Sequence, residues 1–166
     1  MILLRANAGL PCVFYADLYG SMGQKPHHKE DKDTSEKDHN TFVPPTSGGA
    51  ILPKMMLARK YWAYGTQIDY FDEPSCVGFT RFGHPSRSNG DGLAVIMTNG
   101  WEFKVKRMCV GRRHAGEVWT DLLRWCPGRV VIDSEGWGEF LVCPRSVSVW
   151  VCERAFGREL VDGFVL

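Results

Sequence analysis

The stretch that decides the fold is Ile51-Leu-Pro-Lys-Met-Met-Leu-Ala-Arg-Lys-Tyr-Trp-Ala-Tyr-Gly-Thr66, together with the residues that follow it to Phe82. Apolar side chains recur in its first part with the 3.6-residue period of a helix that packs on a core. These positions are Ile51, Met55, Ala58 and Trp62. Gly65 ends the run, as glycine commonly does just beyond a helix. The sequence therefore predicts a helix over 51–62 and a change to β architecture near Ala63.

Beyond this change, short apolar segments alternate with turn signals at the spacing of an antiparallel sandwich, about eight to twelve residues. Asn99-Gly100 closes the second segment with a strong hairpin signal. In the last segment Val147, Val149 and Val151 share one face of the predicted strand. We predict seven or eight antiparallel strands and no long internal repeat. The segments are 76–82, 93–98, 106–110, 116–120, 129–132, 138–142 and 146–151.

The N-terminal part has a different character. Leu10-Pro-Cys-Val-Phe-Tyr15 is a short apolar run without alternation, which is typical of a parallel strand buried on both faces. Residues 1–7 resemble the last turns of a helix that stops at Gly9. Such a strand needs parallel neighbours, which no other segment supplies. Asp17 follows at the end where α/β folds place their sites, and it serves either a site or the turn that leads to Gly20.

Composition excludes several classes of function. The 166 residues carry 20 basic and 19 acidic side chains, so the charge does not indicate a nucleic-acid or anionic membrane partner. No apolar run approaches the ~20 residues of a membrane-spanning helix. The apolar start of the chain has no basic segment ahead of it and stops at Arg5, so we do not interpret it as a signal peptide. We expect a cytoplasmic protein.

The stretch Gln24–Asn40 contains no aliphatic residue. It cannot bury enough apolar surface to offset the entropy of ordering, so we predict a solvated, disordered charged loop at about 24–41. His27, His28 and His39 lie within it, but they lack the apolar frame that holds metal ligands in place, and we assign no metal site. Thr46 or Ser47 is the expected cap of the helix that follows.

The cysteines and the tryptophans of the β part need separate interpretations. No two cysteines have Cys-x-x-Cys spacing, so we predict buried free thiols in a reducing compartment and no zinc site. The tryptophans either fill the core or stack on sugar rings. The cysteines are Cys12, Cys76, Cys109, Cys126, Cys143 and Cys152, and the tryptophans are Trp101, Trp119, Trp125, Trp137 and Trp150.

Several blocks of the sequence resemble α-amylases of glycoside hydrolase family 13. Leu10–Gly20 is similar to the eighth strand and following loop of the (β/α)8 barrel, and Leu57–Asp72 is similar to its final helix and the junction with the C-terminal domain. The resemblance is closest to bacterial liquefying and fungal intracellular enzymes, and it covers residues 2–152 in order. Blocks 92–100, 108–111, 115–121, 136–140 and 146–150 resemble the antiparallel Greek-key C-terminal domain.

The resemblance implies hydrolysis of internal α-1,4 bonds of starch or glycogen with retention, by a carboxylate nucleophile and an acid of raised pKa. The family's catalytic carboxylates precede the eighth strand, so we assign no catalytic, substrate-binding or metal residue to this chain and expect it to be inactive alone. For its own carboxylates we favour capping, packing or solvent-facing roles. The nearest substitutes are Asp69, Asp72, Glu73, Asp121 and Glu139.

The family often binds calcium between barrel and C-terminal domain, through a His-Asp pair and a later Asp. This chain has Pro74-Ser75 and Asn99 in those places. A hard cation needs several oxygen ligands, so we expect calcium in the intact family enzyme but not on this chain alone. Ala16 is a second departure, because relatives usually have glycine beside the active cleft.

We therefore predict a mainly β protein, an antiparallel Greek-key β-sandwich preceded by the last β/α segment of a TIM (β/α)8 barrel. Residues 1–64 are the predicted barrel remnant, 65–152 the sandwich and 153–166 a tail. The expected function is that of the C-terminal part of an α-amylase-like glycoside hydrolase that acts on α-glucan. One alternative is a non-catalytic module that binds glucan or a protein partner, and another is an inactive gene remnant.

Overall fold

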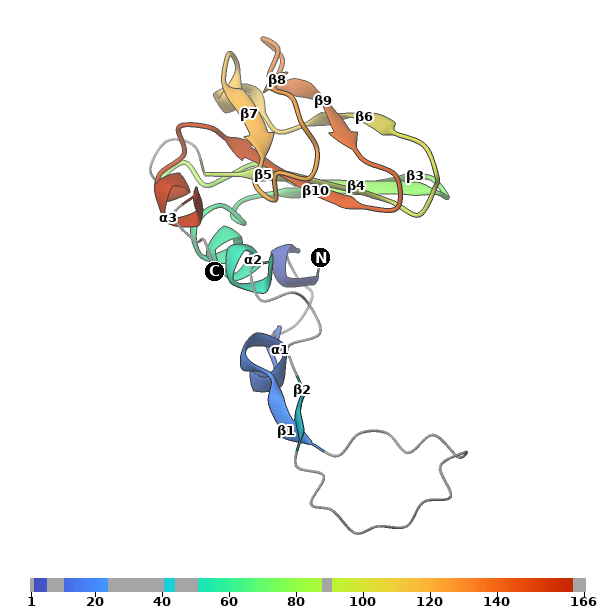
Figure 1. Cartoon of the computed structure of the whole chain (residues 1–166). Coiled ribbons are helices and arrows are strands. Elements are labelled where there is room, and N and C mark those ends of the chain that lie inside the picture. Colours follow the sequence, from blue (N-terminus) through green and yellow to red (C-terminus); the bar gives the residue numbers. More distant parts are fainter. Residues whose placement is uncertain (1, 6–10, 24–40, 44–50, 88–90, 163–166) are drawn as a thin grey trace, which may run out of the picture.

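The computed structural model describes residues 2–5, 11–23, 41–43, 51–87 and 91–162 (Figure 1). The helical elements, in which η marks a 3-10 helix, are η1 (Ile2–Leu4), α1 (Tyr15–Tyr19), α2 (Ile51–Tyr61), η2 (Arg112–His114) and α3 (Arg158–Asp162). The strands are β1 (Ser21–Gly23), β2 (Thr41–Val43), β3 (Gln67–Glu73), β4 (Cys76–Arg81), β5 (Leu93–Thr98), β6 (Lys104–Cys109), β7 (Val118–Asp121), β8 (Val130–Val131), β9 (Trp137–Val142) and β10 (Val147–Cys152). A mainly antiparallel β structure preceded by a helix is thus confirmed.

The centre of the molecule is a six-stranded antiparallel sheet with the strand order β3-β4-β5-β10-β7-β8. β6 and β9 form a separate two-stranded antiparallel sheet. Figure 1 shows this β6–β9 pair over one face of the central sheet and α2 with η1 against the other. The central sheet is therefore covered on both sides, and its inner strands β4, β5 and β10 have little exposed surface.

Large aromatic side chains fill the space between the two sheets. The rings of Trp119 and Phe140 lie 6.0 Å apart, and those of Phe140 and Trp150 lie 6.1 Å apart, near the separations that aromatic pairs prefer. Trp150 Nε1 also donates to the carbonyl of Leu141 at 3.0 Å, so the buried indole is satisfied. Because the sheet is covered from both sides, even Ser148, on the predicted polar face of β10, is fully buried.

The predicted helix is confirmed as α2, and its buried residues are those of the 3.6-residue pattern. Met55, Ala58 and Trp62 are buried. Gly65 follows at φ +79°, and a Cβ there would lie 1.8 Å from the carbonyl oxygen of Gly83. Only glycine fits this close approach, so the end of the helix and the entry into β3 are set by one residue.

The buried parallel strand predicted over 10–15 is wrong. Residues 11–14 have no regular structure, and α1 begins at Tyr15. Phe14 and Tyr15 are each 72% exposed. The apolar run has the composition of a buried strand, but a parallel strand forms only by hydrogen bonding to parallel neighbours, and none of the described residues provides them. Cys12, predicted to be buried, is exposed for the same reason.

The other cysteines agree better with the prediction. None of the six is in a disulfide; Cys76, Cys126 and Cys152 are buried, and Cys109 and Cys143 are half-buried. The charged stretch 24–40, with His27, His28 and His39, lies outside the described residues, as do Thr46 and Ser47. None of the helices that the structure describes is long and apolar enough to cross a membrane.

The hairpin predicted at Asn99-Gly100 is wrong, although the chain does turn there. β5 pairs with β4 and β10, and β6 pairs with β9. The Asn-Gly dipeptide indicates only that the chain turns here. Strand pairing depends on burial, and β6 pairs with β9 in the second sheet, where Met108 is buried in the core. The seven predicted strand segments otherwise correspond to β4–β10.

Strand β3 was not among the predicted segments. Its sequence, Gln-Ile-Asp-Tyr-Phe-Asp-Glu, mixes acidic and aromatic residues and has no strand alternation. β3 forms because it pairs with β4 along one edge, with Ile68 opposite Thr80 and Tyr70 opposite Gly78. As an edge strand it keeps its carboxylates in solvent, where neighbouring cations pair with them.

A buried guanidinium joins the N-terminal segment to the β domain. The side chain of Arg81, on β4, donates to the carbonyl of Gly65 at 3.0 and 3.2 Å and to that of Leu4 at 3.3 Å. Burial, with a smaller effect from the charge of Arg59, lowers the pKa of Arg81 below its ordinary value. A cation placed here is therefore held by carbonyl oxygens alone, and two chain segments depend on it.

We expect Arg81→Met to lower the free energy of unfolding by about 2 kcal/mol, since two buried carbonyls lose their donor. Trypsin should also cleave after Arg5 faster in the variant, because η1 loses one of its side-chain contacts, although those of Arg5 with Asp69 and of Arg59 with the Leu3 carbonyl remain. Urea denaturation and timed proteolysis measure the two effects. Arg87→Met is the matched control, because Arg87 stacks on Tyr64 at the surface, 3.8 Å from the ring centroid. Equal stability of the two variants would contradict the tether.

Candidate functional site

Three of the five carboxylates considered as substitutes for the catalytic ones lie on β3, and each faces a cation. A hydrogen bond from Lys106 is the main reason why the pKa of Asp72 lies below its ordinary value, and Lys104 does the same for Glu73. These contacts explain their presence without any catalytic role. The pairs are Asp69 with Arg5 at 2.7 Å, Asp72 with Lys106 at 2.7 Å and Glu73 with Lys104 at 2.6 Å.

The remaining candidates lie apart from these three. Asp121 is buried at the end of β7 and accepts hydrogen bonds from four backbone N–H groups. Glu139 projects from the exposed face of β9, opposite Arg107 on β6. Asp17 is half-buried in the first turn of α1, next to the half-buried Ala16. The structure therefore distributes these carboxylates over separate elements, each with its own surroundings.

The electrostatics also argue against acid catalysis by these groups. The proton donor of a retaining glycosidase needs a carboxyl whose pKa is raised. Among the described residues, every carboxyl group whose pKa departs clearly from its ordinary value has a lowered one. These groups are Asp72, Glu73, Glu117 and Asp133.

The positions that would hold calcium in the family do not fit a cation here. The Ser75 carbonyl accepts hydrogen bonds from the Asn99 N–H at 3.2 Å and the Thr98 hydroxyl at 2.8 Å. The nearby Glu73 carboxylate already holds the ammonium of Lys104. The oxygens are thus engaged and a positive charge is present. Among the described residues no three His, Cys, Asp or Glu side chains gather as metal ligands would.

The five tryptophans divide into core and surface residues. Trp119 and Trp150 are fully buried and cannot meet a sugar. Trp101 is 78% exposed, and the guanidinium of Arg145 lies over its ring, 4.4 Å from the centroid. Trp125 is 44% exposed, and Trp137 is half-buried. Only these last three retain surface for a ligand.

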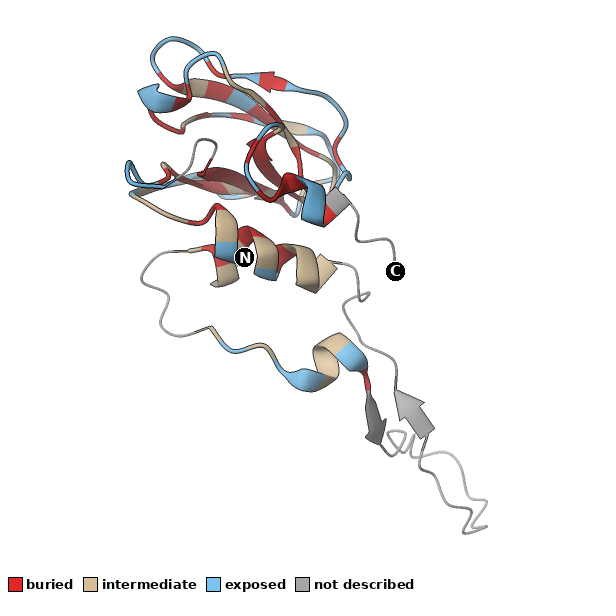
Figure 2. Cartoon of the chain, turned by 90° about the vertical axis from the view of Figure 1, so that its left-hand side faces the viewer, coloured by how far each residue is buried: buried red, intermediate tan, exposed pale blue. Residues whose placement is uncertain are grey.

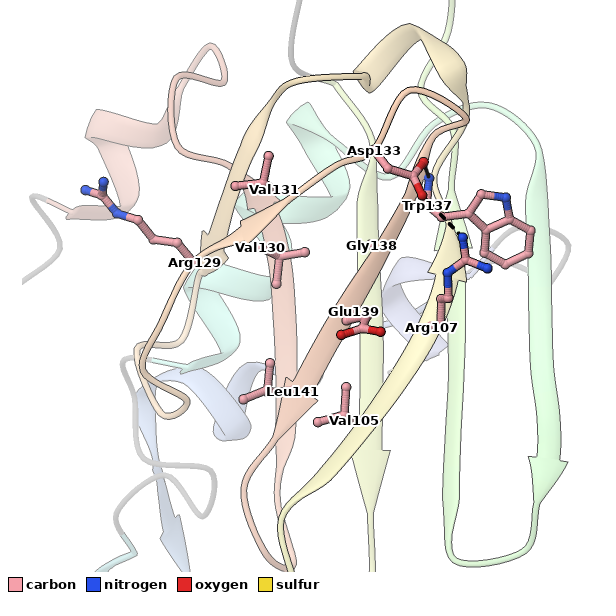
Figure 3. Close-up of a pocket in the computed structure, with 10 residues that line it drawn as sticks. All are labelled: Val105, Arg107, Arg129, Val130, Val131, Asp133, Trp137, Gly138, Glu139 and Leu141. Carbon is pink, nitrogen blue, oxygen red and sulfur yellow. Dashed lines mark hydrogen bonds and ion pairs between the residues drawn. The ribbon is translucent and has the colours of Figure 1, made fainter.

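A groove of about 470 Å³ lies on the outer side of the β6–β9 pair (Figure 3). Gly138 lets β8 lie close to β9 at this groove, because a Cβ there would lie 2.8 Å from Val130 Cγ1. The volume is within the range of ligand sites, which is roughly 300–1,000 Å³. The lining residues are Val105, Arg107, Arg129, Val130, Val131, Asp133, Trp137, Gly138, Glu139 and Leu141.

The polar groups of the groove are largely paired with one another. Arg107 contacts Asp133 at 3.2 Å and lies over the ring of Trp137, 4.8 Å from its centroid, as Figure 3 shows. Asp133 Oδ1 also accepts the backbone N–H groups of Glu135 and Trp137, each at 2.9 Å. The groove offers hydrogen-bonding groups for a hydroxylated ligand but no nucleophile–base pair, so it suits binding and not catalysis.

Of the candidate residues predicted from the sequence, only Glu139 and Trp137 line the groove. The signal was present in the alternation of β6 and β9, where Val105, Arg107 and Leu141 share the face opposite the buried Met108 and Phe140. The alternation does not indicate that β8 lies beside β9, because β8 belongs to the six-stranded sheet and β9 to the two-stranded one.

Comparison with known proteins identifies the β domain. Residues 93–151 match the family model described as "Alpha-amylase C-terminal". The chain is 41% identical over 149 residues to the α-amylase of Bacillus licheniformis, which covers 90% of this chain and 26% of that protein. It is 36% identical over 154 residues to the cytoplasmic α-amylase of Escherichia coli (strain K12), which covers 93% of this chain and 28% of that protein.

A third relative has a related activity in its name. The chain is 37% identical over 150 residues to the glucan 1,4-alpha-maltohexaosidase of Bacillus sp. (strain 707), with 90% of this chain and 25% of that protein covered. The chain therefore spans about a quarter of the length of the curated relatives that it matches. The residues matched by the family model run from β5 to β10, and we conclude that this part of the chain is an α-amylase C-terminal domain.

Proposed function

We propose that this chain is the C-terminal part of an α-amylase-like glycoside hydrolase that cleaves internal α-1,4 bonds of starch or glycogen with retention. The main support is the 41% identity over 149 residues to an α-amylase, which extends across α2 as well as the β domain. In this proposal residues 1–64 are the last segment of a (β/α)8 barrel, 65–152 a Greek-key sandwich and 153–166 a tail. The catalytic carboxylates lie outside this chain.

The exposed apolar side chains near the N-terminus support the proposal that residues 1–64 are the last segment of a larger barrel. Phe14, Tyr15 and Tyr19 are exposed by 72%, 72% and 62%, and α1 extends away from the sheets (Figure 2). Clustered apolar surface of this kind marks a site of contact with other protein. In the proposed enzyme, the remainder of the barrel covers these side chains.

A chimera tests the proposal. The part of the Bacillus licheniformis α-amylase that precedes the matched region is fused to this chain, and release of reducing ends from amylose is measured. We expect the chimera to hydrolyse amylose, while the 166-residue chain and the truncated relative alone do not. An otherwise identical chimera that carries Asp121→Ala, which should destabilise the β domain, should lose thermal stability and activity together. A folded chimera without activity, or hydrolysis by the 166-residue chain alone, would refute the proposal.

A second candidate function is non-catalytic binding of α-glucan, favoured by Trp101. Its indole is 78% exposed beside Phe103, which is 64% exposed, and Arg145 holds one face of the ring. Planar exposed rings of this kind stack on the apolar faces of sugars. The paired polar groups of the β6–β9 groove offer an alternative surface for the same ligand.

Affinity electrophoresis in amylose-containing gels distinguishes these surfaces. We expect the mobility of the chain to fall with amylose and Trp101→Ala to reduce the retardation at least about threefold, the loss of roughly 1 kcal/mol of stacking. Trp137→Ala serves as the matched control in the groove. Unchanged mobility of the unsubstituted chain at every amylose concentration would remove this candidate.

We also propose that the protein works in the cytoplasm and that any calcium of the intact enzyme is held outside this chain. The six free thiols support a reducing compartment, and one relative is named a cytoplasmic α-amylase. The engaged oxygens around Ser75 and Glu73 support the second statement. We expect the thermal midpoint of the chain to be the same in calcium and in EGTA; a reproducible rise in calcium would contradict it.

A further inference from the structure

Two cysteines that are distant in the sequence lie side by side in the fold. Cys126 belongs to the turn that follows β7, and Cys143 follows β9. The thiol of Cys143 donates to the carbonyl oxygen of Trp125 at 3.2 Å, which places its sulfur beside the peptide that begins Cys126. The Cys143 thiol is also one of the neighbours that raise the pKa of the Cys126 thiol. Cys126 is 3% exposed and Cys143 is half-buried.

The backbone around Cys126 is held in place by its neighbours. The carboxylate of Asp121 accepts the N–H groups of Leu123, Trp125 and Cys126 at 3.2, 2.9 and 3.0 Å. The turn therefore cannot move Cys126 away from Cys143 without breaking these buried hydrogen bonds. A disulfide requires Cα atoms within roughly 7 Å, and the hydrogen bond from the Cys143 thiol to the carbonyl oxygen of Trp125 keeps the Cys143 side chain beside Cys126.

We propose that Cys126 and Cys143 form a redox site, a thiol pair that a low-molecular-weight disulfide such as glutathione disulfide oxidises to an intramolecular disulfide. The thiolate of the accessible Cys143 attacks one sulfur of glutathione disulfide, forms a mixed disulfide and releases one glutathione thiolate. Cys126 then gives up its proton, attacks the sulfur of Cys143 and releases the second glutathione. Two protein thiols and one external disulfide are thus converted into one protein disulfide and two glutathione thiols.

The order of the steps has a measurable consequence. Burial, and next the neighbouring Cys143 thiol, raise the pKa of Cys126 to about 11. Thiolate attack by Cys126 is therefore slow near neutral pH, because the thiolate is the nucleophile. The mixed disulfide on Cys143 should accumulate first, and its conversion should accelerate about tenfold per pH unit between roughly pH 8 and 10.

The test uses the full chain in a Cys12→Ser background, which removes the exposed thiol. After incubation with glutathione disulfide, non-reducing digestion and mass spectrometry should find the Cys126 and Cys143 peptides linked and lighter by two hydrogens. Because the linkage closes the intervening chain, the thermal midpoint should rise by about 5–10 °C and return on reduction.

Matched variants decide whether the pairing is specific. Cys143→Ser should abolish the linkage and the thermal shift, and Cys126→Ser should stop the reaction at the mixed disulfide on Cys143. Cys109→Ser removes another half-buried thiol and should leave the linkage unchanged. Persistence of the mixed disulfide at pH 10 in the protein with both thiols, or linkage of Cys143 to a different cysteine, would overturn the proposal.

Discussion

Asp121→Ala should lower the free energy of unfolding by about 4 kcal/mol, the largest effect expected of any single substitution discussed for this chain. The carboxylate is 3% exposed and accepts four backbone N–H groups. Three of them lie in the turn after β7, and the fourth is Val149 at 2.9 Å on β10. Removal of the side chain leaves these donors buried without acceptors, because alanine supplies no replacement. Urea denaturation followed by tryptophan fluorescence measures the loss.

Asp133→Ala is the matched control for this prediction. Asp133 also accepts backbone N–H groups within a turn, but its side chain is 45% exposed, so water replaces the lost acceptor. A much smaller loss is expected. Asp121→Asn should fall between the two, since the amide keeps one acceptor and introduces donors that face other donors. Similar decreases in the free energy of unfolding for Asp121→Ala and Asp133→Ala would show that burial does not increase the contribution of Asp121 to stability.

Glu117→Gln should lower the free energy of unfolding by about 2 kcal/mol at pH 7. One oxygen of Glu117 accepts from His114 Nδ1 at 2.9 Å and from Trp119 Nε1 at 2.8 Å. His114 is fully buried, and its Nε2 lies 3.0 Å from the carbonyl oxygen of Phe82. Both ring nitrogens thus face acceptors, and the charged carboxylate satisfies the ring better than a neutral amide does.

The effect of Glu117→Gln should depend on pH. Burial of this carboxyl, the largest single influence, raises its pKa, but hydrogen bonds from His114 and Trp119 and the charge of His114 together lower the pKa below its ordinary value of 4.5. A pKa that is lower in the folded chain means that the stabilisation is complete above pH 4.5 and is lost as the pH falls through the folded-state value.

Unfolding free energies of the unsubstituted protein and Glu117→Gln, measured at pH 7 and pH 3, test this dependence. The difference between the two proteins should shrink at the lower pH. Glu139→Gln, on the exposed face of β9, serves as the control and should change the free energy of unfolding little at either pH. A difference that is the same at both pH values would show that the charge of Glu117 does not stabilise the fold.

Local sequence patterns predicted α2 and seven strands because the spacing of apolar residues reflects which side chains are buried. The period of Met55, Ala58 and Trp62 located α2, since a helix that packs on one side must repeat its apolar residues in this way. Seven strands were located by their apolar content and the turns between them. The exposed Cys12 and Phe14 show the limit of this reasoning, because composition indicates which environment a segment suits and not whether that environment is present.

The candidate site was harder to predict than the fold. The groove requires β8 to lie next to β9, and the thiol pair requires Cys143 to lie beside the turn that holds Cys126; neither arrangement has a sequence signal. Conversely, the carboxylates that the sequence suggested are explained by their immediate partners, such as Lys106 for Asp72. The family itself was recognisable because several blocks occur in the right order.

The sequence by itself determined the class of the molecule, the position of its helix and the membership of its β domain in the α-amylase family. These properties depend on the spacing of apolar residues and on blocks of adjacent residues, and both are visible in the sequence itself. Only the tertiary structure decided that β6 pairs with β9 and not with β5, that residues 11–14 find no strand partner among the described residues, and that the Cys143 thiol lies beside the carbonyl of Trp125. Each of these depends on competition among distant segments for the same buried surface, which no local pattern encodes.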